Sequence, residues 1–119
     1  MTFELNHLHI KSPDPERTAK FYVDKLGAEI LDNFADVGVQ LNLHGLTINL
    51  TKFVVKQQRQ QHHGIEHIAL DVDDFDEAVR ELIAGGAVLL EQQTISGGRR
   101  ICFLEGPDAV QFELIETAS

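Results

Sequence analysis

The sequence lacks tryptophan, has a single cysteine and contains no long apolar run. The lone Cys102 excludes an internal disulfide, and the opening segment MTFELNHLHI has neither the basic nor the apolar region of a secretory signal peptide. No apolar stretch approaches the roughly 20 residues that a membrane-spanning helix needs. We therefore expect a cytoplasmic protein with no membrane partner.

Basic residues are scarce as well. The chain has 10 lysines and arginines against 19 aspartates and glutamates, which gives a formal net charge of -9. Because affinity for nucleic acid rests on a basic surface, this balance argues against a nucleic-acid partner. With 119 residues, of which 43% are hydrophobic, the chain has the size of a single compact domain.

The chain nearly repeats itself. His7 falls on His67, sixty positions later, when the two halves are aligned, and Asn49 falls on Glu113 at an offset of sixty-four. Two copies of one module therefore account for a single domain of residues 1–119. The first copy covers about residues 3–56 and the second about residues 64–117.

Each copy predicts a strand, a helix and three further strands. Apolar residues alternate along Phe3–Ser12 and Gly64–Val72, which is the pattern of a half-buried strand. Asp14 and Asp74 stand at typical N-cap positions of helices, and Gly27 is a typical helix stop. The predicted fold class is α+β, built from two βαβββ modules.

Alternation also predicts which side chains share a face. His7, His67, Asn49 and Glu113 all fall on the strand face that the helices do not cover. Two imidazoles and one carboxylate are a ligand set that holds a catalytic divalent metal and leaves coordination positions open. If the modules form one sheet, we predict that His7, His67 and Glu113 bind such an ion, with Asn49 as a weaker fourth ligand.

Three stretches resemble a known family. NHLHIKSPDPERTAKFYVDKLG, GIEHIALDVDDFDEAVREL and FLEGPDAVQFELIE are similar to the signature stretches of the vicinal oxygen chelate superfamily, which includes glyoxalase I, methylmalonyl-CoA epimerase and the extradiol dioxygenases. The resemblance implies that the βαβββ modules form a curved, cup-like mixed sheet with helices on its outer face. It also implies a homodimer and one divalent ion (Fe, Mn, Ni, Co or Zn) on His7, His67 and Glu113.

Asn49 falls where the ligand varies between members of that superfamily. Glyoxalase I has a glutamate there, which is both ligand and proton carrier, whereas methylmalonyl-CoA epimerase has a glutamine. The resemblance implies a glyoxalase- or epimerase-like lyase or isomerase that chelates vicinal oxygens of a small-molecule substrate and stabilises an enediolate. Two alternatives stay open, namely an Fe(II) extradiol-type dioxygenase and a metal-free binding protein of the bleomycin-resistance kind. The lack of tryptophan disfavours the binding protein, because such binders stack flat drugs on aromatic walls.

Several other side chains are candidates for catalysis or substrate binding. His9 lies on the same face as His7 and is a candidate base, because imidazole has the ordinary pKa nearest to physiological pH. Glu113 would combine metal binding with a catalytic role. Lys11, Arg99 and Arg100 are candidate contacts for a substrate carboxylate or phosphate, although alternation leaves open which face the two arginines take.

Overall fold

The computed structural model describes residues 1–34, 37–54, 57, 59–60 and 62–117. The chain divides into two compact units. We call His7–Glu66 the N-terminal module, and Met1–Asn6 together with His67–Ser119 the C-terminal module. The predicted end of the first copy, at about residue 56, lies outside the described residues. Within the described part of the chain, neither α-helix has the length and apolar character of a membrane span.

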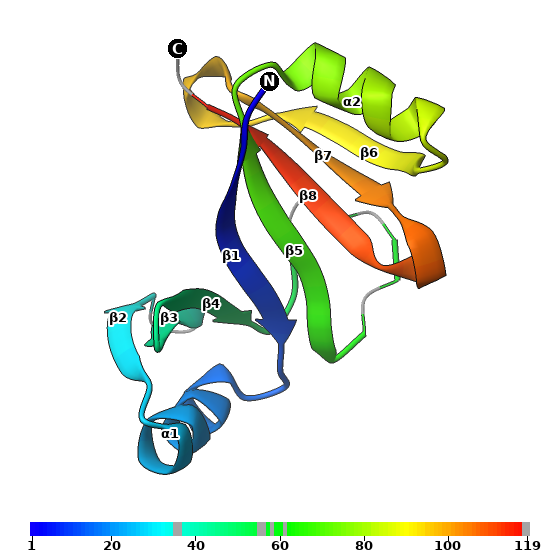
Figure 1. The fold of residues 1–119 in the computed structure, drawn as a ribbon. Coiled ribbons are helices and arrows are strands. Elements are labelled where there is room, and N and C mark those ends of the chain that lie inside the picture. The colour runs from blue at the N-terminus through cyan, green and yellow to red at the C-terminus, as the bar shows by residue number, and fades with distance from the viewer. Residues whose placement is uncertain (35–36, 55–56, 58, 61, 118–119) are drawn as a thin grey trace. The chain divides into compact units, whose positions relative to one another are not determined.

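The N-terminal module is a four-stranded mixed sheet packed against one helix (Figure 1). The strands lie in the order β2-β3-β4-β1, with β1 and β4 parallel and the other neighbours antiparallel. The elements that contribute to it are β1 (Phe3–Lys11), α1 (Pro15–Leu26), β2 (Glu29–Asn33), β3 (Gly38–Leu43) and β4 (Leu46–Thr51).

The C-terminal module repeats this arrangement, with the strand order β5-β8-β7-β6 and a parallel pair β5 and β8. Figure 1 shows α2 lying alongside β6, and α2 contacts both β6 and β8. The α+β class with two βαβββ modules is therefore confirmed. The elements of the module are β5 (Gly64–Val72), α2 (Phe75–Ala84), β6 (Val88–Thr94), β7 (Arg100–Glu105) and β8 (Gln111–Glu116).

Both helices begin at the predicted aspartates. The Asp14 carboxylate accepts a hydrogen bond from the Arg17 backbone N–H at 3.2 Å, and Asp74 accepts one from the Glu77 N–H at the same distance. Each carboxylate thereby satisfies a backbone donor that has no partner inside the helix. Gly27 ends α1 with a φ of 76°, a left-handed conformation that glycine adopts without strain.

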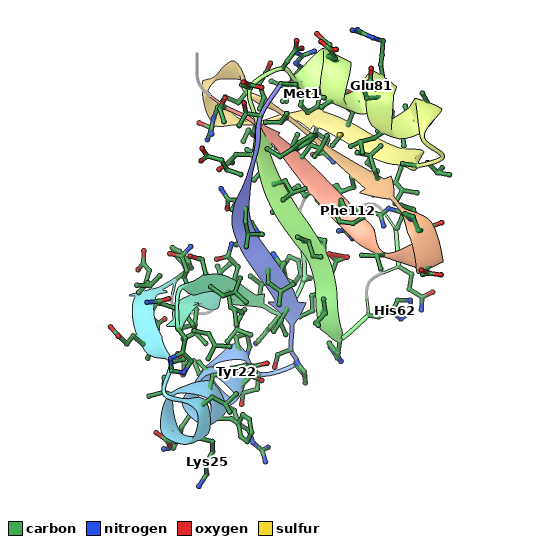
Figure 2. The ribbon with its side chains drawn as sticks, in the orientation of Figure 1. Met1, Tyr22, Lys25, His62, Glu81 and Phe112 are labelled. Carbon is green, nitrogen blue, oxygen red and sulfur yellow. The ribbon has the colours of Figure 1, made fainter. Side chains whose placement is uncertain are left out.

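Each module has a core between its helix and one face of its sheet. In the N-terminal module Tyr22 packs against this core, and Figure 2 shows Lys25 on the side of α1 away from the strands. Leu26 is 44% exposed, so the apolar face with which α1 packs on the sheet ends before this residue. The buried core residues of this module are Ile10, Ala19, Ala28, Val39, Leu41, Ile48 and Leu50. The corresponding set in the C-terminal module is Val72, Phe75, Ala78, Cys102, Leu104 and Leu114.

The two parallel strand pairs have the same register. His9 lies opposite Asn49 on β1 and β4, and Ala69 lies opposite Glu113 on β5 and β8. These positions differ by the same sixty and sixty-four residues that align the two copies in the sequence. The repeat in the sequence is therefore a repeat in strand register, so equivalent residues of the two modules point to equivalent faces.

Candidate functional site

The face of the C-terminal module that lies away from α2 holds a buried pair of candidate ligands. His67 Nε2 lies 3.1 Å from Glu113 Oε1, and the side chains are 1% and 12% exposed. The register of β5 and β8 brings them together, because Glu113 lies opposite Ala69 and His67 points to the same face two residues earlier. Two ligand atoms that lie roughly 2.0–2.2 Å from one ion, at close to a right angle, are about 3 Å apart. The pair therefore fits two neighbouring positions around a divalent metal.

Apolar side chains surround this pair. The Phe103 ring packs edge-on against the His67 ring, with centroids 5.2 Å apart and an interplanar angle of 72°. Phe103 lies opposite Glu113 in the antiparallel pair of β7 and β8, and Ala69 and Ile101 are buried on the same face. Such walls exclude water and lower the local dielectric constant, so charges interact more strongly there than at the surface.

The equivalent position in the N-terminal module carries an amide in place of the carboxylate. Gln40, on β3, lies opposite Asn49 as Phe103 lies opposite Glu113. The Gln40 Nε2 donates a hydrogen bond of 2.9 Å to the Asn49 Oδ1. The oxygen that Asn49 would offer to a metal therefore already accepts a hydrogen bond from Gln40.

His7 and His9 are buried side by side on β1, at 7% and 8% exposure. Their ring centroids are 5.8 Å apart, and the planes are tilted by 57°. The His9 Nε2 lies 2.7 Å from the Thr51 Oγ1 on the neighbouring strand β4. The predicted face is thus occupied by both histidines, as alternation indicated.

Lys11 is buried on the same strand, at 4% exposure. Burial lowers the pKa of its ammonium group, because the charged form loses hydration, and the negative charge of Glu66 partly offsets this effect. The Glu66 carboxylate also accepts a hydrogen bond of 2.9 Å from the Gln57 Nε2. The N-terminal module therefore presents a cation next to its buried histidines.

The two candidate arginines differ in their surroundings. Arg99 is exposed, whereas Arg100 lies on the helix side of β7. The Arg100 guanidinium forms ion pairs with Asp76 at 2.8 Å and Glu116 at 2.9 Å, and it stacks over the Phe75 ring at 4.7 Å. Its donors are engaged on the face opposite to His67 and Glu113, because Arg100 and Phe103 point to opposite sides of β7.

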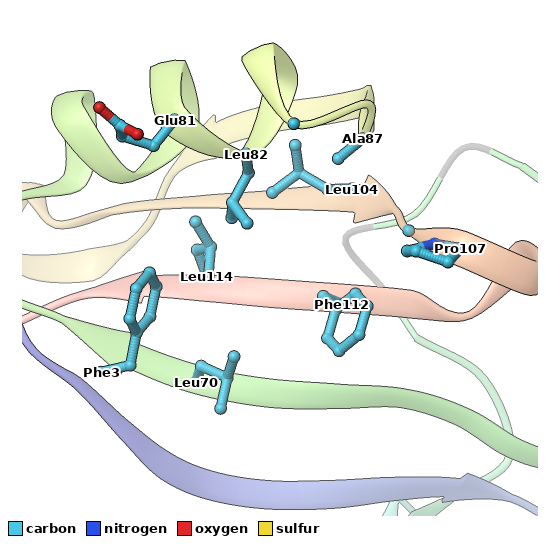
Figure 3. A pocket seen from close by; sticks show the side chains of 11 residues that line it. Phe3, Leu70, Glu81, Leu82, Ala87, Leu104, Pro107, Phe112 and Leu114 are labelled. Atoms are coloured by element: carbon cyan, nitrogen blue, oxygen red, sulfur yellow. The ribbon is translucent and has the colours of Figure 1, made fainter.

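The C-terminal module also has an apolar cavity of about 350 Å³ beside α2 (Figure 3). Leu70, Leu82 and Phe112 contribute to its walls. Leu70 and Phe112 point away from the face that carries His67 and Glu113, because adjacent residues of a strand face opposite sides. The cavity is therefore separate from the candidate metal site.

Three residues that contact the candidate residues within their own modules were not among the predicted site residues. Gln40, Thr51 and Phe103 contact Asn49, His9 and His67 respectively. Alternation along their strands places all three on the uncovered face, and the repeat relates Gln40 to Phe103. The signal was therefore present in the sequence, but the contacts depend on cross-strand register, which alternation alone does not fix.

Comparison with known proteins identifies the family. Residues 4–114 match the model of the Glyoxalase/Bleomycin resistance protein/Dioxygenase superfamily. Over 129 residues the chain is 31% identical to a lactoylglutathione lyase from Haemophilus influenzae, a match that covers 98% of this chain and 94% of the relative. The chain therefore belongs to this superfamily, which is the vicinal oxygen chelate superfamily that the sequence resembles.

Solved structures share the fold over nearly the whole chain. A methylmalonyl-CoA epimerase from Mycobacterium tuberculosis superposes with a TM-score of 0.65 at 26% identity, covering 97% of this chain and 88% of the epimerase. A hypothetical protein from Bacillus halodurans C-125 has a TM-score of 0.72 at 21% identity, covering 100% of this chain and 97% of its own. The relatives thus include both a lyase and an epimerase.

The ion pairs of Arg100 predict a pH-dependent contribution to stability. Arg100 holds the pKa of the Glu116 carboxyl below its usual range, so this pair stabilises the fold above the pKa that glutamate has in the unfolded chain. Its contribution is lost as the pH falls through the lowered pKa of the folded state. We expect Glu116→Gln to lower the urea midpoint at neutral pH, and the difference from wild type to shrink in acid. Glu105→Gln, at the exposed end of β7, is the control, and equal effects of both variants would contradict the prediction.

Proposed function

We propose that this protein is a divalent-metal-dependent enzyme of the glyoxalase or epimerase kind, acting on a small molecule with two vicinal oxygens. The observation that carries the proposal is the buried contact of 3.1 Å between His67 Nε2 and Glu113 Oε1. His7 is proposed as the third ligand, because it occupies the position of His67 in the repeat. Membership of a superfamily with lyase and epimerase relatives supports this assignment.

In the proposed reaction the ion and the protein have different tasks. A bound divalent ion supplies Lewis acidity, which stabilises negative charge that develops on a substrate oxygen. The protein orients the ligands, since Phe103 packs on the ring of His67 and limits its rotation. Ala69, Ile101 and Phe103 exclude water from the same face, which strengthens that stabilisation.

We propose that His9 is the general base, which accepts the proton that the substrate loses. Asn49 occupies the superfamily position that carries a glutamate in glyoxalase I. A side-chain amide does not take up a proton at neutral pH, so Asn49 cannot act as the base. His9 is buried on the same face of the same module and lies opposite Asn49 on the neighbouring strand. This arrangement favours an epimerase-like proton transfer over that of glyoxalase I.

Lys11 is proposed to contact an anionic oxygen of the substrate. Its buried ammonium group has one charged neighbour, Glu66, among the described residues that affect its pKa. A substrate carboxylate or thioester oxygen would give it a second partner and form a charge-assisted hydrogen bond. Arg99 is exposed and is proposed for a rim contact, whereas the ion pairs of Arg100 exclude it from the proposal.

If His67 and Glu113 bind the ion, removal of either side chain should abolish or strongly weaken metal binding. Titration of chelator-treated protein with Co²⁺ or Mn²⁺ in a calorimeter should show one site in the wild type. His67→Ala and Glu113→Gln should each weaken binding by more than the roughly 10–100-fold that loss of a supporting outer group produces. His63→Ala is the control, because this histidine is exposed and precedes β5.

A calorimetric titration in which the wild type and the His67→Ala variant bind the ion equally would remove the proposed metal site. A loss of binding in His63→Ala of the same size would show that the ion binds exposed histidines instead.

The role of His9 predicts metal-dependent exchange of an α-proton. In D₂O, NMR should detect exchange of the α-proton of methylmalonyl-CoA or lactoylglutathione with metal-loaded wild type. His9→Gln should slow this exchange by roughly 100-fold or more, the usual size of a general acid–base contribution. Both proteins are compared at saturating metal concentration, because His9 is among the histidines whose ring nitrogens could reach an ion. Equal exchange rates in His9→Gln and wild type would refute the assignment.

The role of Lys11 predicts weaker binding of a two-oxygen anion. Oxalate presents vicinal oxygens and is a suitable probe for the metal-loaded protein. Lys11→Met should weaken oxalate binding by roughly 10- to 150-fold, because a hydrogen bond to a charged group contributes about 1.5–3 kcal/mol. Its thermal midpoint should not fall, since burial already disfavours the ammonium form. Lys25→Met, in the exposed last turn of α1, should bind oxalate like the wild type, and equal binding by Lys11→Met would exclude the contact.

A further inference from the structure

We infer that Thr51 is a positioning residue for His9, and that its hydroxyl selects the tautomer in which the His9 Nε2 carries the proton. The inference rests on the proposed function, because it assigns a purpose to the orientation of the proposed proton carrier. The orientation itself follows from hydrogen bonds within the N-terminal module.

The hydrogen bonds of Thr51 fix the direction of its contact with His9. A threonine hydroxyl has one proton to donate. Thr51 Oγ1 donates that proton to the Phe53 carbonyl oxygen at 2.9 Å. At its contact of 2.7 Å with His9 Nε2, the same oxygen must therefore accept, and Nε2 must be the donor. The lone pair of the neutral His9 ring then lies on Nδ1, because neutral imidazole carries one N–H and one acceptor nitrogen.

The backbone holds Thr51 in place for this contact. Thr51 is the last residue of β4 and lies opposite Lys11 of β1, and its carbonyl oxygen accepts a hydrogen bond of 2.9 Å from the Ser12 N–H. The chain leaves the strand after Thr51, which brings the Phe53 carbonyl within reach of the hydroxyl two residues earlier. A β-branched side chain also has few rotamers, so little freedom is left to the hydroxyl.

The C-terminal module shows that the fold forms without the hydrogen-bonded pair of His9 and Thr51. The positions of His9 and Thr51 correspond by register to Ala69 and Ile115 on β5 and β8. The same pairing of parallel strands therefore forms with an alanine and an isoleucine at these two places. Because the scaffold forms without the polar pair, its presence in the N-terminal module points to a function beyond folding.

The consequence for catalysis is a defined position of the proton acceptor. With the Nε2 proton held by Thr51, the ring presents Nδ1 to a proton in one orientation. Without the Thr51 hydroxyl, the His9 ring can adopt both tautomers and a second orientation. Only a fraction of the protein molecules then has Nδ1 placed to accept the substrate proton. Loss of an outer hydrogen-bond partner that orients a functional histidine typically reduces activity or affinity by roughly 10–100-fold.

Isotope-edited NMR tests the assignment directly. The ¹⁵N shifts of the His9 ring would be recorded in Zn²⁺-loaded protein at a mildly alkaline pH, for wild type, Thr51→Val and Thr51→Ser. Wild type and Thr51→Ser should show a protonated Nε2 and an acceptor Nδ1, whereas Thr51→Val should show a mixture of tautomers. Thr47→Val is the matched control, because Thr47 lies on the same face of the same strand.

Kinetics completes the test. Thr51→Val should lower the rate constant of α-proton exchange roughly 10-fold without changing Zn²⁺ affinity, and Thr51→Ser should restore it. A wild-type ring protonated on Nδ1, or a Thr51→Val variant with unchanged shifts and rate, would overturn the inference. A large loss of Zn²⁺ affinity in Thr51→Val would also overturn it, since the pair would then belong to the metal site. If His9→Gln keeps full activity, the proposed function of His9 fails and Thr51 loses its catalytic role, even where the tautomer result holds.

Discussion

The contact between His67 and Glu113 is the constraint on which the site of the C-terminal module depends. An imidazole and a carboxylate lie 3.1 Å apart, and both are largely removed from water. Burial of such groups is unfavourable unless they are paired or bind a metal. The parallel register of β5 and β8 is what brings them together, since a slip by one residue would turn Glu113 to the helix side. The core under α2 fixes that register, because Leu114 and Val72 must face it.

The two modules use one backbone plan for different chemistry. Where the C-terminal module has Ala69, Phe103 and Glu113, the N-terminal module has His9, Gln40 and Asn49. In the first set Ala69 and Phe103 are apolar neighbours of one carboxylate. In the second set Gln40 donates a hydrogen bond to Asn49, and His9 is hydrogen-bonded to Thr51. The C-terminal module thus carries two of the proposed metal ligands, and the N-terminal module carries the proposed proton carrier and the proposed substrate contact. The two modules therefore keep the same strand register while the side chains on it differ.

Much of this arrangement could be predicted from the sequence, because it follows from local rules. Capping residues set where the helices begin, at Asp14 and Asp74. The alternation of strand residues sets the face on which His67 and Glu113 lie. Both signals are read from residues that are neighbours in the sequence. The internal repeat of sixty and sixty-four positions predicted the two modules, because equivalent residues recur at equivalent places in both copies. Contacts set by partners distant in the sequence could not be predicted in this way. The ion pairs of Arg100 with Asp76 and Glu116 depend on where α2 lies on the sheet. The hydrogen bond from Gln40 to the Asn49 oxygen depends on the register of β3 and β4.

We propose that His67 and Glu113 are ligands of one divalent ion. The most direct measurement is anomalous diffraction at the cobalt edge from crystals of Co²⁺-loaded protein. We expect an anomalous peak at roughly 2.0–2.2 Å from both His67 Nε2 and Glu113 Oε1, with His7 as the proposed third ligand. A peak only at exposed side chains such as His62 and His63, with His67 and Glu113 still in direct contact, would contradict it.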